Sequence, residues 1–208
     1  MDQLNLNLIL NREENEQKLI NCLNNFEENK KNVLTKRGMY IYGSPGTGKT
    51  MFVEKILKKL NYDVIKYDAG DVRNKTIVDQ ITKHNMSDKN VLSLMQKKTK
   101  KIAIIMDEID GMNSGDKGGI NTLIKLIRPK KTKKQKKEET TMIPIICIGN
   151  YHIDKKIKEM IKICETVELK DPTNIQIKNI VNILMPKLEE ELKEKMVIFI
   201  QGDLRKLK

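Results

Sequence analysis

The stretch GSPGTGKT, Gly43 to Thr50, decides the fold of this 208-residue chain. It matches the pattern G-x-x-x-x-G-K-[ST] in full, and its surroundings are those that the pattern needs. The β-rich run GMYIY ends immediately before it. Behind it, apolar residues recur from Val53 at i, i+3, i+4 and i+7, as on one face of a helix. A strand, a glycine-rich turn and a helix in this order predict a phosphate-binding loop.

The residue types of this loop suit the binding of nucleotide phosphates. Glycines let the backbone curl so that several N–H groups point at phosphate oxygens, and the following helix aims its positive end at the same place. Lys49 is expected to reach the β- and γ-phosphates, and the Thr50 hydroxyl is expected to bind Mg²⁺. The predicted nucleotide-binding residues are Gly43, Ser44, Pro45, Gly46, Thr47, Gly48, Lys49 and Thr50.

Two further strand ends carry polar residues. Asp107 and Glu108 follow the apolar run IAIIM, and open α/β sheets bind ligands at the carboxyl ends of their strands. Asp107 is expected to hold Mg²⁺ together with Thr50, and Glu108 to polarise an attacking water as general base. Asn150 ends the run IPIICIG and is expected to orient that water, although Gly-Asn is also an ordinary turn pair.

Strand-like and helix-like segments alternate along the chain, which predicts an α/β fold with a parallel sheet covered on both faces. Asn11 is expected to cap the first helix, with Glu14 completing a capping box. The predicted strands are 38–42, 62–67, 101–106, 143–149 and 165–170. Besides the helix after the phosphate-binding loop, the predicted helices are 11–26, 73–83, 89–98, 120–127 and 155–163.

A boundary follows at DPTN, residues 171–174. Thr173 and Gln176 form a second capping-box pattern, and the apolar spacing that begins at Ile177 opens an amphipathic helix. No further alternation of strands and helices follows. We therefore expect a nucleotide-binding α/β domain over residues 1–170 and a small, partial helical lid over residues 171–208.

Charge and composition bound the partners. The formal net charge is +12, and seven of the ten residues 128–137 are Lys or Arg. This excess favours polyanions such as nucleic acid, while a composition rich in Lys, Asn and Ile is an equal explanation. Three cysteines without paired spacing argue against a disulfide framework or a zinc site, and Cys147 and Cys164 are expected to be buried. No apolar run is long enough to span a membrane, and MDQLNLNLIL does not match a signal peptide, so we expect an intracellular protein without membrane partners.

Together these features resemble the AAA+ ATPases. In that family the Asn at the strand tip is called sensor 1, here Asn150, and a Gly-Asp-Leu-Arg element in the lid is called sensor 2. Residues 202–205 match this element, so the resemblance implies that Arg205 reaches the γ-phosphate. It further implies a five-stranded parallel sheet, a Walker A and Walker B site for ATP and Mg²⁺, and ATP hydrolysis.

Within that family the chain is similar to the large subunit of replication factor C, over about residues 38–205. The similarity lies in YDVIKYDAGDVRNKTIV, MDEIDGMNSGDKGGINTLIKLI and IPIICIGN, although Asp68 and Gly70 replace the Asn and Ser of that subunit's Asn-Ala-Ser-Asp motif. The resemblance implies a subunit of a hetero-oligomeric AAA+ ring that acts on a sliding clamp and primer–template DNA. The expected location is the nucleus or a viral DNA replication compartment.

One departure bears on activity. Clamp-loader small subunits carry a Ser-Arg-Cys motif whose Arg acts as a finger on the neighbouring subunit's ATP. Here Ile163 stands before Cys164, so the resemblance implies that this chain receives a finger and gives none. Because such fingers are worth on the order of 10³ to 10⁵ in rate, the chain alone should hydrolyse ATP slowly.

Two alternatives stay open at this stage. ILNREENEQKLINCLNNF, residues 9–26, resembles the helix before the phosphate-binding loop in origin-recognition initiators, which would make the chain an ATPase that marks origins. The second alternative is a nucleotide-dependent switch or scaffold in which hydrolysis is unimportant.

The basic run is expected to be an insertion over residues 129–142, between the helix that Pro129 ends and the strand that Asn150 ends. We expect a mobile loop that faces DNA, an accessory grip beside Asn150, and a solvated loop without a ligand is the alternative. If all seven charges met phosphates, they would add about −6 to the salt slope of duplex binding. The predicted DNA-contacting residues are Lys130, Lys131, Lys133, Lys134, Lys136 and Lys137.

Overall fold

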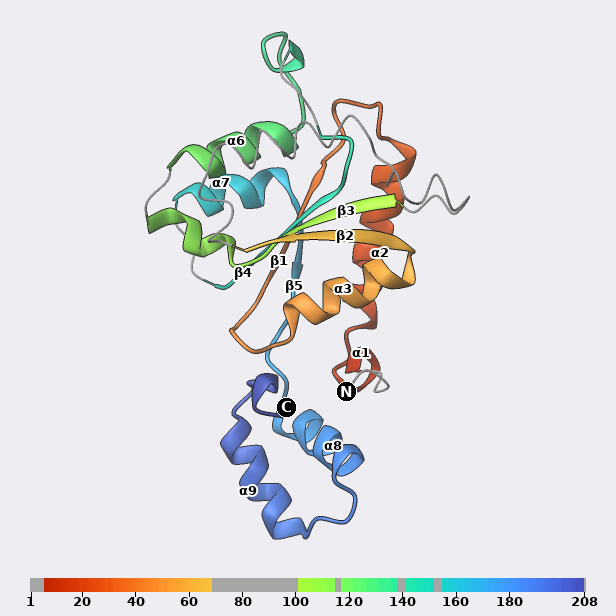
Figure 1. The fold of residues 1–208 in the computed structure, drawn as a ribbon, viewed down its shortest axis with the longest axis vertical. Coiled ribbons are helices and arrows are strands. Elements are labelled where there is room, and N and C mark those ends of the chain that lie inside the picture. The colour runs from red at the N-terminus through yellow and green to blue at the C-terminus, as the bar shows by residue number, and fades with distance from the viewer. Residues whose placement is uncertain (1–5, 69–100, 115–116, 138–140, 152–154, 208) are drawn as a thin grey trace.

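Five parallel strands form one sheet at the centre of the molecule (Figure 1). The structure is a computed structural model that describes residues 6–68, 101–114, 117–137, 141–151 and 155–207. The strand order is β2-β3-β4-β1-β5, and every pairing is parallel. The strands are β1 (Gly38–Tyr42), β2 (Tyr62–Tyr67), β3 (Lys101–Met106), β4 (Ile145–Gly149) and β5 (Glu165–Glu168). This confirms the predicted α/β fold with a five-stranded parallel sheet.

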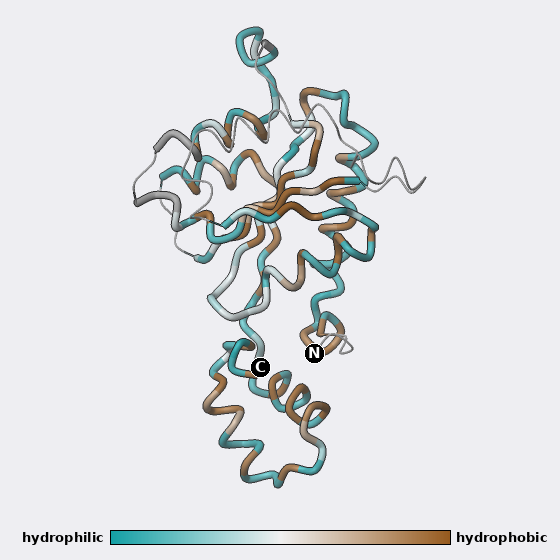
Figure 2. Tube along the Cα trace, viewed as in Figure 1, coloured by the Kyte–Doolittle hydropathy of each residue, from teal (hydrophilic) through white to brown (hydrophobic). Residues whose placement is uncertain are grey.

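Helices cover both faces of the sheet, because successive side chains of each strand point to opposite faces and most of them are apolar. In β3, Ala103 and Ile105 pack toward α2 and α3, while Ile104 and Met106 pack toward α6 and α7. Figure 2 shows the resulting apolar centre. No helix among the described residues is both long enough and apolar enough to span a bilayer. The covering helices are α2 (Glu13–Glu28), α3 (Lys49–Lys59), α6 (Lys117–Ile127) and α7 (Lys155–Ile163).

The predicted start of the first long helix is wrong. A short helix, α1 (Leu6–Ile9), precedes it, and the chain turns between the two at Asn11, which has a left-handed φ of 51°. Helix α2 then begins at Glu13, with Arg12 at the N-cap position and no side-chain cap hydrogen bond. Asn tolerates the left-handed conformation, so Asn11 serves the turn instead of the cap. The helices predicted at 73–83 and 89–98 lie outside the described residues.

The helical lid consists of α8 (Asn174–Leu184), α9 (Glu190–Ile200) and the 3₁₀ helix η3 (Leu204–Leu207), which lie together beyond the carboxyl ends of the strands (Figure 1). The predicted capping box at Thr173 and Gln176 is present, with both reciprocal hydrogen bonds. Helix α1 joins this unit, since its neighbour Leu10 packs against Ile180 and Leu204. The segment before the phosphate-binding loop is therefore packed against the lid.

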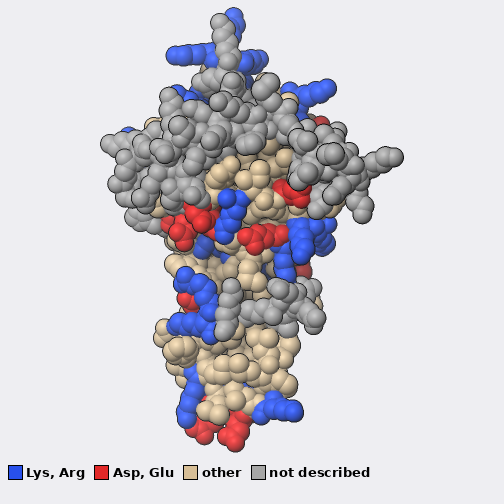
Figure 3. Space-filling view, in the orientation of Figure 1, with Lys and Arg blue, Asp and Glu red and all other residues tan. Residues whose placement is uncertain are grey.

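The basic run projects from the opposite end of the molecule (Figures 1 and 3). It leaves α6, contains the 3₁₀ helix η2 (Gln135–Lys137), and returns to the amino end of β4, whereas Asn150 lies beyond the carboxyl end of that strand. The expected position beside Asn150 is therefore wrong, because a helix-to-strand connection in a parallel sheet lies at the amino edge. A second 3₁₀ helix, η1 (Ile109–Ser114), follows β3 at the other edge.

The lysines of the run differ in exposure. Lys130 is buried, its backbone N–H donates to the Val33 carbonyl at 2.8 Å, and its Nζ donates to the Lys125 carbonyl. Lys130 is thus unavailable for the predicted DNA contact. Lys131, Lys133, Lys134 and Lys136 are exposed, while the side chain of Lys137 lies outside the described part.

The cysteines behave as predicted. Cys147 lies in β4 and Cys164 directly after α7, and both are buried and free. Burial raises the pKa of the Cys164 thiol to about 12 and raises that of Cys147 as well. They therefore pack as small apolar side chains in the core between the sheet and the α6–α7 layer.

Candidate functional site

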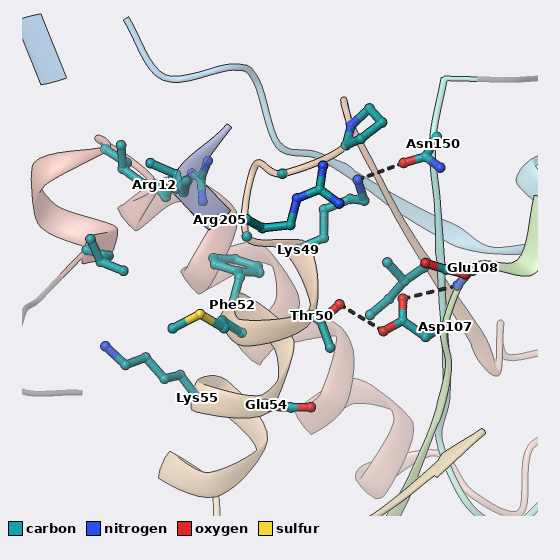
Figure 4. Close-up of a pocket in the computed structure, with 18 of the residues that line it drawn as sticks. Arg12, Lys49, Thr50, Phe52, Glu54, Lys55, Asp107, Glu108, Asn150 and Arg205 are labelled. Carbon is teal, nitrogen blue, oxygen red and sulfur yellow. Dashed lines mark hydrogen bonds between the residues drawn. The ribbon is translucent and has the colours of Figure 1, made fainter. Parts of the chain in front are cut away.

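The register of the sheet brings three strand ends to one place. Tyr42 of β1 lies opposite Gly149 of β4, so the phosphate-binding loop and Asn150 leave the sheet side by side. Asp107 follows β3 at the same edge, where its backbone N–H donates to the Tyr67 carbonyl at 2.8 Å. A cavity of about 440 Å³ opens above these strand ends (Figure 4). Its lining also includes Glu108, the lid residues Leu204 and Arg205, and the N-terminal residues Leu6, Asn7 and Leu10.

The phosphate-binding loop owes its shape to two glycines with left-handed φ, Gly46 at 81° and Gly48 at 82°. Gly48 sits at the N-cap position of α3, so the first free N–H groups of that helix face the cavity. A Cβ on Gly46 would lie 2.1 Å from Oδ1 of Asp203 in the lid, and the Gly46 carbonyl accepts the Leu204 N–H at 2.9 Å. The loop therefore touches the lid closely enough to exclude any side chain at this position.

Lys49 is held inside the loop by three oxygens. Its Nζ donates to the carbonyls of Gly43 at 2.9 Å and Ser44 at 2.8 Å, and to Oδ1 of Asn150 at 3.0 Å (Figure 4). Burial lowers the pKa of Lys49, and the nearby carboxylates of Asp110 and Asp107 oppose that shift. An ammonium in this position bridges two strand ends and is ready to meet a phosphate that enters the loop.

Thr50 and Asp107 form the oxygen pair expected of a Mg²⁺ site. The Thr50 hydroxyl donates to Oδ2 of Asp107 at 2.8 Å, and the same oxygen lies 3.1 Å from Nζ of Lys66 on β2. One hydroxyl and one carboxylate beside a phosphate-binding loop fit Mg²⁺, which usually takes few protein ligands and completes its shell with phosphates and waters. The predicted pair is therefore brought together, and Lys66 is an addition that the motif did not predict.

Glu108 lies at the mouth of the cavity and is exposed. It has a left-handed φ of 51°, and its backbone N–H donates to Oδ1 of Asp107 at 3.0 Å. This turn separates the two acidic side chains: Asp107 is directed at Thr50, and Glu108 stands apart from it (Figure 4). The arrangement leaves the Glu108 carboxylate accessible to water at the edge of the cavity.

Asn150 is oriented by a second acid. Its Nδ2 donates to Oδ2 of Asp110 at 2.9 Å, while its Oδ1 accepts from Lys49, so both ends of the amide are used. Gly149 before it leaves room for Tyr40, since a Cβ there would lie 2.3 Å from the tyrosine hydroxyl. The motif analysis did not single out Asp110, although an acid three residues after Asp107 was a visible signal.

Arg205 reaches the cavity from the lid and is paired within its own element. Its Nη2 donates to Oδ2 of Asp203 at 2.7 Å and its Nε to Oδ1 at 2.9 Å. This hydrogen bonding lowers the pKa of Asp203 to about 2. The guanidinium is exposed and lies on the same cavity as Lys49. The lid therefore contributes one cation to the site, as the resemblance implied.

Arg12 is a buried site residue that sequence reasoning missed. Its Nη1 donates to the Thr47 carbonyl at 2.9 Å and its Nη2 to the Lys170 carbonyl at 3.4 Å. Burial lowers its pKa to about 10, with Asp171 acting in the opposite direction. Ser44 adds a second link by donating to Oδ2 of Asp171 at 3.0 Å. The phosphate-binding loop is thus tied to the segment from which the lid extends.

The comparisons with known proteins agree with this geometry. Residues 39–172 match the family model described as AAA, ATPase family associated with various cellular activities. The chain is 28% identical over 210 residues to replication factor C subunit 1 of Saccharomyces cerevisiae, an alignment that covers 91% of this chain and 23% of that protein. It is 26% identical over 202 residues to the replication factor C large subunit of Thermofilum pendens, covering 95% of this chain and 44% of that protein.

A third relative, replication factor C subunit 1 of Drosophila melanogaster, is 31% identical over 141 residues, which cover 65% of this chain and 13% of that protein. The chain thus spans less than half the length of these relatives. Its similarity extends to both eukaryotic and archaeal large subunits, as the sequence motifs indicated. With a family match over most of the chain and a phosphate-binding loop that faces Asp107 and Asn150, the protein belongs to the AAA family of ATPases.

Proposed function

We propose that this chain is the ATP-binding and ATP-hydrolysing module of a clamp loader's large subunit, acting with other AAA+ subunits on DNA and a sliding clamp. The observation that carries the proposal is the joint placement of Lys49, the Thr50–Asp107 pair and Asn150 around one cavity, in a chain similar to replication factor C large subunits. The proposed location is the nucleus or a viral DNA replication compartment.

The proposed division of labour follows from the contacts. Residues 43–50 hold the phosphates through backbone N–H groups, and Lys49 exchanges its carbonyl partners for phosphate oxygens. Thr50 and Asp107 hold Mg²⁺, which supplies charge neutralisation on the phosphates when bound. Glu108 polarises the attacking water, and Asn150, fixed by Asp110, orients it. Arg205 reaches the γ-phosphate from the lid.

The proposed rate of the isolated chain is low. Ile163, the last residue of α7, stands where small subunits carry the Arg of their finger motif, so this chain takes a finger from a neighbour and supplies none. The exposed lysines 131, 133, 134 and 136 are proposed to contact DNA phosphates from the end of the molecule opposite the lid. The proposed domains are 1–170 and 171–208, with the basic insertion at 129–142.

The deciding experiment measures ATP turnover in steps. The chain is assayed alone, then with clamp-loader small subunits, then with primer–template DNA and a sliding clamp added. Stimulation that requires both primer–template and clamp supports the proposal. Stimulation by duplex DNA alone would support the origin-recognition alternative instead.

Glu108→Gln tests whether hydrolysis matters. The variant keeps the side-chain size and should still bind ATP, while turnover falls by about 10²- to 10⁴-fold, the usual worth of a general base. A variant that loses turnover but retains clamp loading over repeated cycles would favour a nucleotide-dependent switch or scaffold.

A further inference from the structure

Lys66 occupies an unusual position beside the carboxylate that is expected to face the metal. It is the penultimate residue of β2 and lies opposite Ile105 in the register of β2 with β3. Ile105 packs on the sheet face that α3 covers, so Lys66 stands on that face too. This places its side chain between α3 and the end of β3, where Thr50 and Asp107 meet.

Two acids share the Lys66 ammonium. Nζ lies 3.1 Å from Oδ2 of Asp107 and 3.9 Å from Oε1 of Glu54 on α3. The Asp107 side chain is 11% exposed, whereas those of Lys66 and Glu54 are 40% and 46% exposed. Lys66 therefore reaches from solvent onto a largely buried carboxylate and keeps a second acidic partner at the cavity wall.

The oxygen that Lys66 contacts is the one that matters for a metal. Oδ2 of Asp107 also accepts the Thr50 hydroxyl at 2.8 Å, and Oδ1 accepts the Glu108 N–H at 3.0 Å. A cation at Oδ2 neutralises the carboxylate before any metal arrives, and it repels a dication that binds to the same group.

We propose that Lys66 is an internal cation that competes with Mg²⁺ for the Asp107 carboxylate and thereby weakens the Mg²⁺ dependence of nucleotide binding. Glu54 is the partner to which the ammonium moves when the metal takes Asp107. The inference rests on the proposed function, because it assumes that this cavity binds a nucleotide. Lys66 acts as a positioning residue, since it reaches the metal site through Asp107.

The test compares nucleotide affinity with and without the metal. A fluorescent N-methylanthraniloyl derivative of ATP is titrated with the chain in EDTA and over a series of free Mg²⁺ concentrations at constant ionic strength. The readout is the ratio of the dissociation constant in EDTA to that in saturating Mg²⁺. Lys66→Met should raise this ratio by about 3- to 10-fold, the size expected for one charge at a partly solvated site, and Lys66→Arg should leave it near the wild-type value.

The matched control is Lys36→Met, which removes the same charge from an ion pair with Glu165 that lies before β1, at the other edge of the sheet. Its ratio should equal that of the wild type. If Lys66→Met does not fold, Lys66→Gln repeats the measurement with a side chain that keeps the strand end polar.

The outcomes separate the two proposals. A ratio that is unchanged in the Met or Gln variant overturns the role of Lys66, even if ATP binds well. Equal loss of binding in EDTA and in Mg²⁺ also overturns it, because Lys66 would then be a direct nucleotide ligand. A wild-type chain that binds no nucleotide in either condition overturns the proposed function itself.

Discussion

At the scale of single residues, the site combines groups that are already partnered. Lys49, Asn150, Asp107 and Arg205 each make hydrogen bonds to protein groups, and each of these bonds lies where a phosphate, a metal or a water is proposed to bind. Ligand binding at such a site exchanges partners, and its affinity is a difference between two sets of contacts. Substitutions that remove an internal partner are therefore as informative as those that remove the ligand-binding group.

The pair of Asp203 and Arg205 gives the first prediction. Asp203→Asn removes the carboxylate that holds the guanidinium, so Arg205 becomes freer to bind a γ-phosphate. ATP affinity should rise by about 2- to 10-fold while ADP affinity stays constant, as expected for one solvent-exposed charge contact. Isothermal titration calorimetry with both nucleotides measures the effect, and an equal change for ATP and ADP would contradict it.

The same pair should be insensitive to pH in the ordinary range. The pKa of Asp203 is lowered to about 2, so its contribution to stability is complete above the unfolded value near 3.8 and is lost only as pH falls toward 2. The difference between wild type and Asp203→Asn should thus be constant from pH 5 to pH 8.

Cys164 gives a prediction about alkaline pH. Burial raises the pKa of its thiol to about 12, so the folded state retains this proton while the unfolded chain loses it near pH 8.5. The free energy of unfolding should therefore fall as pH rises above about 8.5, and Cys164→Ala should flatten that slope. Urea unfolding at pH 8 to pH 10 measures it. Cys22→Ala, at a half-buried thiol, should change the slope less, and equal slopes for all three proteins would refute the assignment.

At the scale of elements, the connection between α6 and β4 is a basic projection on a fixed base. Lys130 and Arg37 anchor that base: Arg37 is buried, and its guanidinium donates to the carbonyls of Thr141 and Lys30. The remaining lysines are carried away from the sheet (Figure 3). The run thus behaves as two parts, a buried support and an exposed tip.

Substituting the exposed tip tests its role in DNA binding. Changing Lys131, Lys133, Lys134 and Lys136 to Gln removes four charges, which should reduce the magnitude of the salt slope of duplex binding by about 3 to 4, since each phosphate contact is worth about 0.9. Fluorescence anisotropy between 50 and 200 mM salt, about the range in which such slopes are read, provides the measurement. The control changes the four α7 lysines Lys155, Lys156, Lys158 and Lys162 to Gln. Equal slopes for wild type and the tip variant would exclude the contact.

At the scale of the whole molecule, the cavity is shared by three units: the sheet edge, the N-terminal segment and the lid. A ligand that touches all three should stabilise the fold as a unit. With MgATP at about 100 times its dissociation constant, the gain is about 2.7 kcal/mol, which corresponds to a rise in melting temperature of about 5 to 10 °C for a chain of this length. Thermal unfolding with and without nucleotide measures it.

A control variant links this stabilisation to the lid. Leu10→Ala weakens the contact of the N-terminal segment with Ile180 and Leu204, so the rise caused by MgATP should shrink. Ile183→Ala, at an exposed position on α8, should retain the full rise. A rise of equal size in both variants would show that the lid contributes nothing to the bound state.

The sequence predicted those parts of the fold whose signals are local. Each of the five strands is an apolar run, and each was placed to within two residues. Asp107 and Asn150 could be joined to the phosphate-binding loop because carboxyl ends of parallel strands meet at one edge. Arg205 was found only through the family resemblance, since its pattern alone predicts a basic end.

What sequence reasoning missed depends on distant contacts. The contacts of Arg12 with Thr47 and Lys170 span 35 and 158 residues, and no local pattern marks them. The capping box at Asn11 failed because α1, packed on the lid, turns the chain at that residue. Lys130 read as one more charge in a basic run, and only the fold shows that Val33 and Lys125 bury it.

The contacts of Arg12 have a consequence for the order of synthesis. A ribosome makes Arg12 early, yet its Lys170 partner follows 158 residues later, and the closure of so long a loop comes late in folding. Until then the guanidinium has only the Thr47 carbonyl to bind, and Leu10 lacks Ile180 and Leu204. A nascent chain that stops before the lid would display a finished sheet and an unfinished nucleotide pocket, so acquisition of nucleotide affinity would mark the moment at which translation has passed the lid.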